Sequence, residues 1–438
     1  MKFERRPRAP EKVVLPTISP LASIVLAGVF SIVFVVSTYS TTLATYSADL
    51  PIQSSVLRQS LYLSCAAAIM LLHVTKLVNV FSLLPRAFIP AAAWFLLSVL
   101  WSSQPLISAS RLSVVFISSV ACFVSVTLLG RERTIGLLSR LLLAVLLTNL
   151  LTVVLFPSLG VMFYERVNAT HQWRGLFAEK NEAGAIAALS ALLFMFGSPF
   201  KSKLLNYACL FLSAILLLSS LSRTALIMFF VSSVIGWLFY ARGSADSVGR
   251  VVSAKAAALI ASVPTLIAVA ALLLATISGD ALLGLVSDPE TFTNRGYIWH
   301  PLVASYLENP VLGTGFGAYW TDAALQPGQV SGDWLQKVGQ GHNGYLDLLV
   351  QVGLPGLAFI ILGTVTWPLY HVLRLQPRPL VQLGLPISLI VFCLGSNLTE
   401  SGLFTRDVAW NTFLLIGLSL LALSGRAQPI TKQRTRKS

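Results

Sequence analysis

Charged residues are scarce in this sequence. Asp, Glu, Lys and Arg make up 11% of its 438 residues, whereas 55% are hydrophobic and the mean hydropathy is +0.77. A typical soluble protein carries about 25% charged residues. Because the deficit extends over the whole length, lipid must be the solvent for most of the chain, and we expect an all-α, polytopic membrane protein.

Several chemical motifs are also missing. No Gly-rich phosphate loop ending in Lys-Ser or Lys-Thr is present, which excludes a P-loop ATPase. The net charge of +14 comes from short basic clusters between apolar runs, which indicate contacts with membrane lipids and not with nucleic acid. We expect no disulfide, metal or cofactor, because the cysteines lie inside apolar runs without CxxC or metal-like spacing: Cys65, Cys122, Cys209 and Cys393.

About twelve apolar runs are long enough to predict transmembrane helices, each needing about 20 residues. The first resembles a signal peptide, but we expect it to remain as an anchor because many spans follow. The predicted spans are 21–38, 56–74, 87–101, 112–129, 136–156, 183–198, 204–220, 224–240, 256–277, 344–370, 380–396 and 408–424.

The Lys and Arg residues orient these spans, since they favour the cytoplasmic side. Placing the N-terminus inside puts 22 of the 31 basic residues inside. The organisation is then a basic tail (1–20), nine spans (21–277), a large, partly helical outer loop (278–343), three spans (344–424) and a second basic tail (425–438). The basic residues left outside are Arg58, Arg111, Arg166, Arg174, Lys180, Arg223, Arg295, Lys337 and Arg406.

Some of these outer residues stand beside other polar groups. Arg174 precedes Glu179, Lys180 and Asn181 at the start of an apolar run, and we expect Asn181 to be the N-cap of a helix that can attract an anion. The same charges could merely solvate a helix end. Arg223 lies in a very short outer turn, where snorkelling to the membrane surface is an equally good explanation.

The large outer loop contains further candidates. Arg295 begins an amphipathic segment, and Gly313-Thr-Gly-Phe-Gly317 predicts sharp backbone turns and not a dinucleotide site, since no βαβ context surrounds it. At the end of the loop stands His342, which alone is more often structural than catalytic. Beside it lie Asn343 and Tyr345, and the last outer turn holds Glu400 and Arg406.

Several cations and one His beside apolar helices suit a substrate with an apolar tail and a phosphate head. Arginine binds phosphate bidentately and stays charged in poor solvent. A departing pyrophosphate also needs its growing negative charge neutralised. Both lipid-linked pyrophosphoryl sugars and ordinary phospholipids fit this description.

The pattern resembles the O-antigen ligase and O-antigen polymerase superfamily over roughly residues 165–370. The most specific mark of that family is a His followed by ten residues and a Gly, here His342 to Gly353. Arg223 and Arg295 match its outer arginines. Residues 175–184 are similar to the Gly-x-Phe-x-His-Lys-Asn-x-x-Gly of exopolysaccharide-production members, although Glu179 replaces the usual His.

The resemblance implies a bacterial inner-membrane glycosyltransferase with cytoplasmic termini and a periplasmic active site. It would be metal-independent and inverting, with an undecaprenyl-pyrophosphate-linked oligosaccharide as donor and a saccharide or lipid A-core as acceptor. Arg223 and Arg295, with Arg174 or Lys180, would bind the pyrophosphate. His342 would take the proton of the acceptor, while Glu179 and Glu400 stay alternative bases.

Three classes of function are compatible with the sequence. The first is the enzyme, as an exopolysaccharide polymerase or as an O-antigen ligase, working with polysaccharide-export proteins and membrane lipids. The second is a flippase for lipid-linked sugars, which the nearly uncharged spans disfavour. The third is a structural scaffold, which leaves the outer arginines unexplained.

Overall fold

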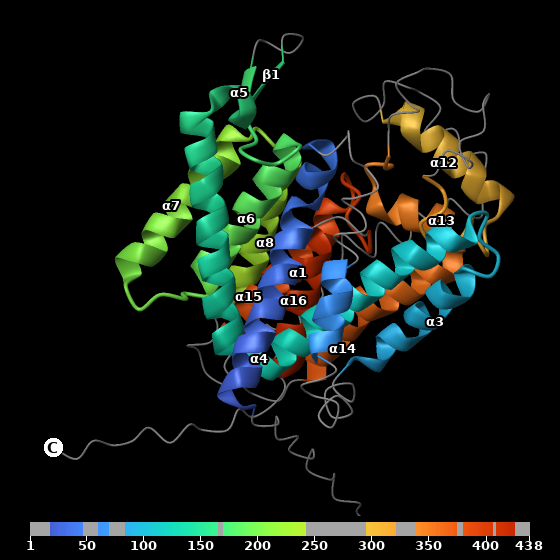
Figure 1. The fold of residues 1–438 in the computed structure, drawn as a ribbon, viewed down its shortest axis with the longest axis horizontal. Helices are drawn as coiled ribbons and strands as arrows, with labels where there is room; N and C mark the ends of the chain where they lie inside the picture. Colours follow the sequence, from blue (N-terminus) through green and yellow to red (C-terminus); the bar gives the residue numbers. More distant parts are fainter. Residues whose placement is uncertain are drawn as a thin grey trace, which may run out of the picture.

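The computed structural model describes residues 18–46, 60–69, 84–164, 170–241, 295–320, 339–374, 380–405 and 409–424. Helices dominate these parts, and Figure 1 shows them gathered into one bundle. They are α1 (Pro20–Tyr46), a helix over Ser60–Ile69, α3 (Ile89–Ser98), α4 (Pro105–Leu155), α5 (Pro157–Gly160), α6 (Lys180–Phe196), α7 (Lys203–Ser219), α8 (Arg223–Ala241), α12 (Gly296–Glu308), α13 (Gly344–Ile361), α14 (Trp367–Arg374), α15 (Gly384–Ser396) and α16 (Ala409–Ser424).

Short irregular pieces complete the described structure. Two 3-10 turns, Arg86–Phe88 and Leu380–Leu383, lead into α3 and α15, and a π-helical stretch, Leu362–Thr366, joins α13 to α14. Strands β1 (Val161–Tyr164) and β2 (Thr170–Trp173) form an antiparallel hairpin with Val161 opposite Trp173. The predicted all-α class is therefore confirmed apart from this small hairpin.

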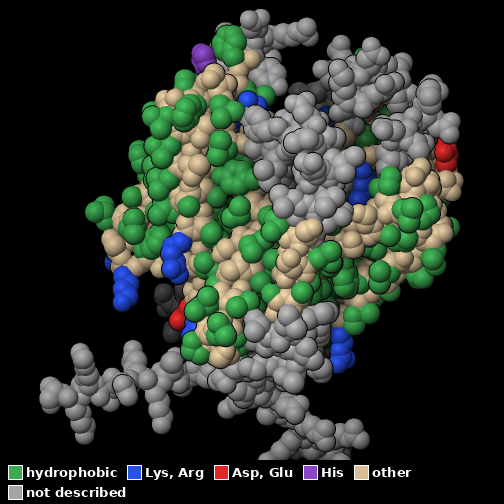
Figure 2. All heavy atoms as spheres, viewed as in Figure 1, with side chains coloured by type: hydrophobic (Ala, Val, Ile, Leu, Met, Phe, Trp, Pro, Cys, Tyr) green, Lys and Arg blue, Asp and Glu red, His purple; other side chains and the backbone are tan. Residues whose placement is uncertain are grey.

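Every predicted span except 256–277, which lies outside the described residues, contains a described helix. Among the residues that the structure describes, three helical stretches can cross a membrane by length and composition, Pro20–Tyr39, Pro105–Leu155 and Gly344–Leu373, whereas the other apolar helices found there have 10–17 residues. Figure 2 shows hydrophobic side chains spread over the described surface, with few Lys, Arg, Asp or Glu side chains among them. This supports a helical membrane protein, while the number of crossings and the domain boundaries stay predictions.

The longest helix, α4, is two helices joined at Gly130. Its 51 residues include this glycine at φ +75° and ψ 171°, which ends one helix and redirects the chain into the next. Each half is about 37 Å long at 1.5 Å per residue, enough for one crossing. The break falls between the predicted spans 112–129 and 136–156, and the two halves run in different directions in Figure 1.

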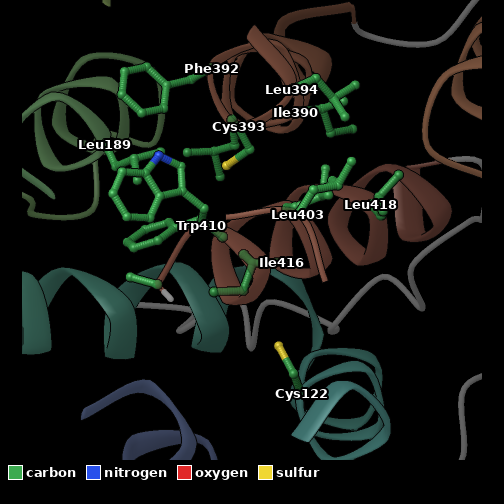
Figure 3. Close-up of a cluster of buried hydrophobic side chains, with 14 of the residues drawn as sticks. Cys122, Leu189, Ile390, Phe392, Cys393, Leu394, Leu403, Trp410, Ile416 and Leu418 are labelled. Atoms are coloured by element: carbon green, nitrogen blue, oxygen red, sulfur yellow. The ribbon is translucent and has the colours of Figure 1, made fainter. Parts of the chain in front are cut away.

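The core is built around α6, which is buried on nearly all sides from Ala183 to Phe196. It packs against α7, α8 and α15. Figure 3 shows Leu189 of α6 beside Phe392 of α15 and Trp410 of α16. All four cysteines are buried free thiols, as expected for small apolar side chains.

A second break, in α13, fixes the loop that follows α12. Gly353 has φ +67° and ψ −177°, and the carbonyls of the broken turn take partners from elsewhere. The amides of Thr314 and Gly315 donate to the carbonyls of residues 350 and 351 at 3.0 and 2.8 Å. The indole of Trp94 donates to the carbonyl of residue 352 at 2.8 Å. The sharp turns predicted here are confirmed by positive φ values at Gly313, Gly315 and Gly317.

Candidate active site

Four segments that are far apart in the sequence meet at the end of the bundle where α12 lies (Figure 1). They are the start of α6, the start of α12, the residues before α13, and the turn at 397–405 between α15 and α16. Most of the residues predicted from the sequence as site candidates belong to these segments. We therefore take this meeting point as the candidate active site.

Glu400 lies at the centre of the site. Its side chain is only 10% exposed. One carboxylate oxygen, Oε1, accepts a hydrogen bond from Asn181 Nδ2 at 2.9 Å and lies 3.5 Å from Arg295 Nη2. The other, Oε2, lies 3.5 Å from His342 Nδ1. One carboxylate thus connects three predicted site residues from three different segments.

The backbone around His342 is held on both sides. His342 has φ +48°, a left-handed conformation that costs a residue with a side chain about 1–2 kcal/mol. Before it, the amide of Gly341 donates to both carboxylate oxygens of Asp347, at 3.1 and 3.0 Å. After it, the amide of Asn343 donates to Ser401 Oγ at 3.0 Å. These bonds offset the strain and aim the imidazole at Glu400.

The start of α13 is anchored on the turn that carries Glu400. The amide of Gly344 donates to the carbonyls of Asn397 and Glu400 at 2.9 and 3.0 Å. A Cβ at position 344 would lie 2.2 Å from Asn397 Oδ1, so only glycine permits this approach. Asn343 caps α13, its Oδ1 accepting from two backbone amides. The buried Tyr345 donates its hydroxyl proton to a backbone carbonyl of α15 at 2.9 Å and packs in the core.

One local prediction about α6 is wrong. Asn181 is not the N-cap: α6 begins at Lys180, and Glu179 occupies the cap position with an extended backbone and no side-chain cap bond. The side-chain nitrogen Nδ2 of Asn181 instead donates a hydrogen bond to Glu400 across the site. Asn181 thus lies inside the first turn of α6, and its side chain makes a tertiary hydrogen bond to a carboxylate.

The turn that carries Arg223 packs against the start of α6. A Cβ at Gly184 would lie 2.7 Å from Ser220 Oγ, so the two segments are in direct contact. Arg223 begins α8 with an exposed side chain. The next residue, Thr224, shares a 2.8 Å hydrogen bond with Thr399, which precedes Glu400. The structure thereby brings Arg223 to the edge of the same site.

The charges at the start of α6 influence one another. Desolvation, followed by repulsion from Arg223, lowers the pKa of the Lys180 ammonium group. The Glu179 side chain keeps an exposed surface, yet protein atoms crowd it, and this desolvation raises the pKa of its carboxyl group. The nearby Glu400 raises that pKa further, whereas His342, Arg174 and Lys180 oppose the increase.

Arg174 contributes charge from the loop that precedes α6. Its Nε and Nη1 donate to the carbonyls of Leu159 and Ala178 at 3.0 and 3.3 Å, so the guanidinium also ties this loop together. Asn149 of α4 supports the same loop, since its Oδ1 accepts from the amide of Leu176 at 2.7 Å. Arg406, the remaining predicted site residue, lies outside the described residues.

Asp347 is a positioning residue that the sequence reasoning did not select. It is 3% exposed, and besides the Gly341 amide it accepts the indole proton of Trp320 at 2.8 Å. Trp299 of α12 donates to the carbonyl of Gly341 at 2.8 Å and fixes the same segment. The sequence could have indicated this role, because Asp347 is a carboxylate in the first turn of an otherwise apolar helix, and such a charge needs partners.

The described part of the site combines cations that can bind an anionic head group with an imidazole and two carboxylates that can accept protons. In the ranges that the structure describes, His, Cys, Asp and Glu side chains do not gather into a group suited to a metal ion.

Comparisons with known proteins agree on one superfamily. Residues 208–361, which include Arg223, Arg295 and His342, match the family described as O-Antigen ligase. The chain is also 28% identical, over 279 residues or 62% of its length, to the exopolysaccharide production protein ExoQ of Rhizobium meliloti (strain 1021). It spans 61% of the length of that relative. The resemblance to the O-antigen ligase and polymerase superfamily that the sequence motifs predicted is thereby confirmed.

Proposed function

We propose that this protein is an inner-membrane glycosyltransferase that polymerises oligosaccharides carried on undecaprenyl pyrophosphate, at the periplasmic face. The observation that carries the proposal is the meeting of His342, Arg295 and Asn181 around Glu400, with Arg223 and Lys180 beside them. Cations for a pyrophosphate and a base for a hydroxyl are the two requirements of such a transfer.

In the proposed reaction, Arg295 and Arg223 bind the pyrophosphate of the donor, with Lys180 and Arg174 adding positive charge. The hydroxyl of the acceptor attacks the anomeric carbon from the face opposite the pyrophosphate, so the configuration inverts. His342 takes the proton of that hydroxyl, and the electrons of the broken glycosyl bond leave on the pyrophosphate, which the cations stabilise. No metal is needed, because fixed cations neutralise the leaving group.

The polymerase is preferred because the chain is similar to an exopolysaccharide production protein and shares the Lys180-Asn181 stretch typical of such members. The second candidate is a ligase that transfers a finished chain to a lipid A-core or another acceptor, since the matching family is described as O-Antigen ligase. A flippase is less well supported, because the carbonyls of the broken turn in α13 are bound to protein groups and not open to a ligand.

A deletion strain separates the two candidates. Its surface carbohydrate is sized on a gel after carrier-linked material is separated from released or lipid A-linked material. Loss of long chains with persistence of single repeat units supports the polymerase. Long chains that accumulate on the carrier lipid contradict it and support the ligase.

The site assignment is tested by complementing that strain with variants. We expect His342→Ala to lower activity about 10²- to 10⁴-fold, the range for loss of a general base. Arg223→Lys should also lower activity, because lysine cannot form the bidentate contact. Matched controls are His300→Ala on the exposed face of α12 and Arg140→Lys, whose side chain bonds its own helix. Full activity of both site variants at normal membrane levels contradicts the assignment.

A further inference from the structure

Glu400 takes no direct part in the proposed reaction, yet it contacts two residues that do, His342 and Arg295. Its two carboxylate oxygens have different partners: Oε2 lies beside His342, whereas Oε1 holds Arg295 and Asn181. A carboxylate on the surface would be satisfied by water. This one is 10% exposed and directed at a base and at an anion-binding cation together.

We propose that Glu400 is a positioning residue that fixes His342 in the tautomer with its proton on Nδ1 and sets the distance between this base and Arg295. This inference rests on the proposed function, because it assigns a role within that reaction. Nδ1–H donates to Glu400 Oε2, which leaves Nε2 unprotonated and able to accept the proton of the acceptor hydroxyl. The contact of 3.5 Å is long, and contacts of this kind shorten when substrate binds.

The placement of Glu400 is fixed by the backbone and not by its side chain alone. The backbone carbonyl of Glu400 accepts a hydrogen bond from the Gly344 amide at 3.0 Å. The hydroxyl Oγ of the next residue, Ser401, accepts one from the Asn343 amide, also at 3.0 Å. Both amides lie within two residues of His342. Because the turn that carries the carboxylate is hydrogen-bonded to the segment that carries the imidazole, their relative position is set before substrate arrives.

The charge balance of the step follows from this arrangement. The proton moves from the acceptor hydroxyl to Nε2 while the new glycosidic C–O bond forms and the bond to pyrophosphate breaks. The imidazolium so produced has the Glu400 carboxylate beside it, which stabilises the positive charge. The proton then passes to water, and Glu400 itself keeps its charge throughout. Arg295, held by the other oxygen, is presented to the departing pyrophosphate.

Other ionisable groups also face this site. Glu179 precedes α6, Asp347 belongs to α13, and both interact electrostatically with His342. Lys180 interacts with Glu400 from the start of α6. The effect of Glu400 on the pH profile must therefore be separated from that of its exposed neighbour Glu179. For this purpose, each measurement is repeated in a Glu179→Gln background.

The test is the kinetics of purified Glu400→Gln and Glu400→Asp proteins in detergent, with an undecaprenyl-pyrophosphate-linked oligosaccharide as donor. We expect Glu400→Gln to lower kcat about 10- to 100-fold, within the range of a lost support to a general base. In this variant no carboxylate at position 400 competes with the pyrophosphate of the donor for Arg295, so KM for the donor should not rise. The acid limb of the pH–rate profile should move to lower pH, since an imidazolium without its carboxylate forms less readily.

Further variants make the result decisive. Glu400→Asp, which keeps the charge on a shorter arm, should recover part of the lost kcat, and Glu308→Gln on the exposed end of α12 should match the wild type. If Glu400→Gln does not accumulate, Glu400→Asp alone serves, and kinetics equal to the wild type then overturn the inference.

The failures of the two hypotheses are distinguishable. An inactive His342→Ala beside a Glu400→Gln with wild-type kcat and pH profile overturns the role of Glu400 and leaves the proposed function standing. A raised KM with an unmoved pH profile also overturns it, because that result indicates direct contact with substrate. Full activity of His342→Ala overturns the proposed function itself.

Discussion

Gly353, which closes the motif that begins at His342, provides a sharp test of the structural reasoning. We predict that Gly353→Ala destabilises the protein without touching the chemistry directly. The residue has φ +67° and ψ −177°, a combination that is essentially restricted to glycine. A Cβ there would lie 2.0 Å from the carbonyl oxygen of Val311, and this neighbour is backbone that cannot rotate away.

The magnitude follows from the contacts around the break. Forcing alanine into this conformation costs about 1–3 kcal/mol. Relief of the clash requires the loop after α12 to move, which weakens the bonds from the amides of Leu354, Thr314 and Gly315 at 2.9, 3.0 and 2.8 Å. Each contributes about 1 kcal/mol net. The sum of about 4–6 kcal/mol is a large part of the 5–15 kcal/mol that typically stabilises a protein.

The assay is thermal unfolding of purified protein in detergent, followed by tryptophan fluorescence. We expect the midpoint to fall on the order of 5–15 °C. The matched control is Gly28→Ala in α1, where a Cβ meets no atom within 4 Å and alanine favours the helix, so the midpoint should stay equal or rise slightly. A Gly353→Ala protein with an unchanged midpoint refutes the reasoning, because this glycine is then not required for stability.

Three further predictions concern the framework of the site. Asn343→Ala removes both cap bonds of α13 and should cost about 0.5–2 kcal/mol, whereas Asn343→Asp should restore most of it, as measured by thermal unfolding. Asn149→Ala leaves the Leu176 amide and the Tyr39 hydroxyl without this partner and should cost about 1–3 kcal/mol per group; an unshifted midpoint contradicts a stabilising role for these partly buried bonds of 2.7 and 3.0 Å. Because the pKa of Glu179 is raised above its ordinary 4.5, its ionisation works against folding, so stability is lost as pH rises through the folded pKa. Glu179→Gln should therefore lose less stability than the wild type between about pH 4.5 and neutrality. Equal losses in the melting temperatures of the two proteins over that range count against a raised pKa of Glu179.

The sequence alone determined that this chain is helical and where its helices lie. Runs of apolar residues can satisfy their backbone polar groups in lipid only as helices, so each predicted span within the described parts contains one. Polar residues between apolar runs made His342, Arg295 and Arg223 candidates in a chain with 11% charge, and the resemblance to family motifs then favoured a functional role for them. The break at Gly130 falls between two spans that the sequence predicted separately, 112–129 and 136–156.

Only the tertiary structure decided which of these residues meet. Asn181 and Glu400 are 219 positions apart, and His342 and Glu400 are 58 apart, so no local periodicity relates them. Their contact depends on the packing of helices through close approaches such as Gly184 on Ser220 and Gly344 on Asn397. The incorrect N-cap at Asn181 was a local prediction from residue preference: the helix begins one residue earlier, at Lys180, and folding brings the Asn181 side chain to the carboxylate of Glu400.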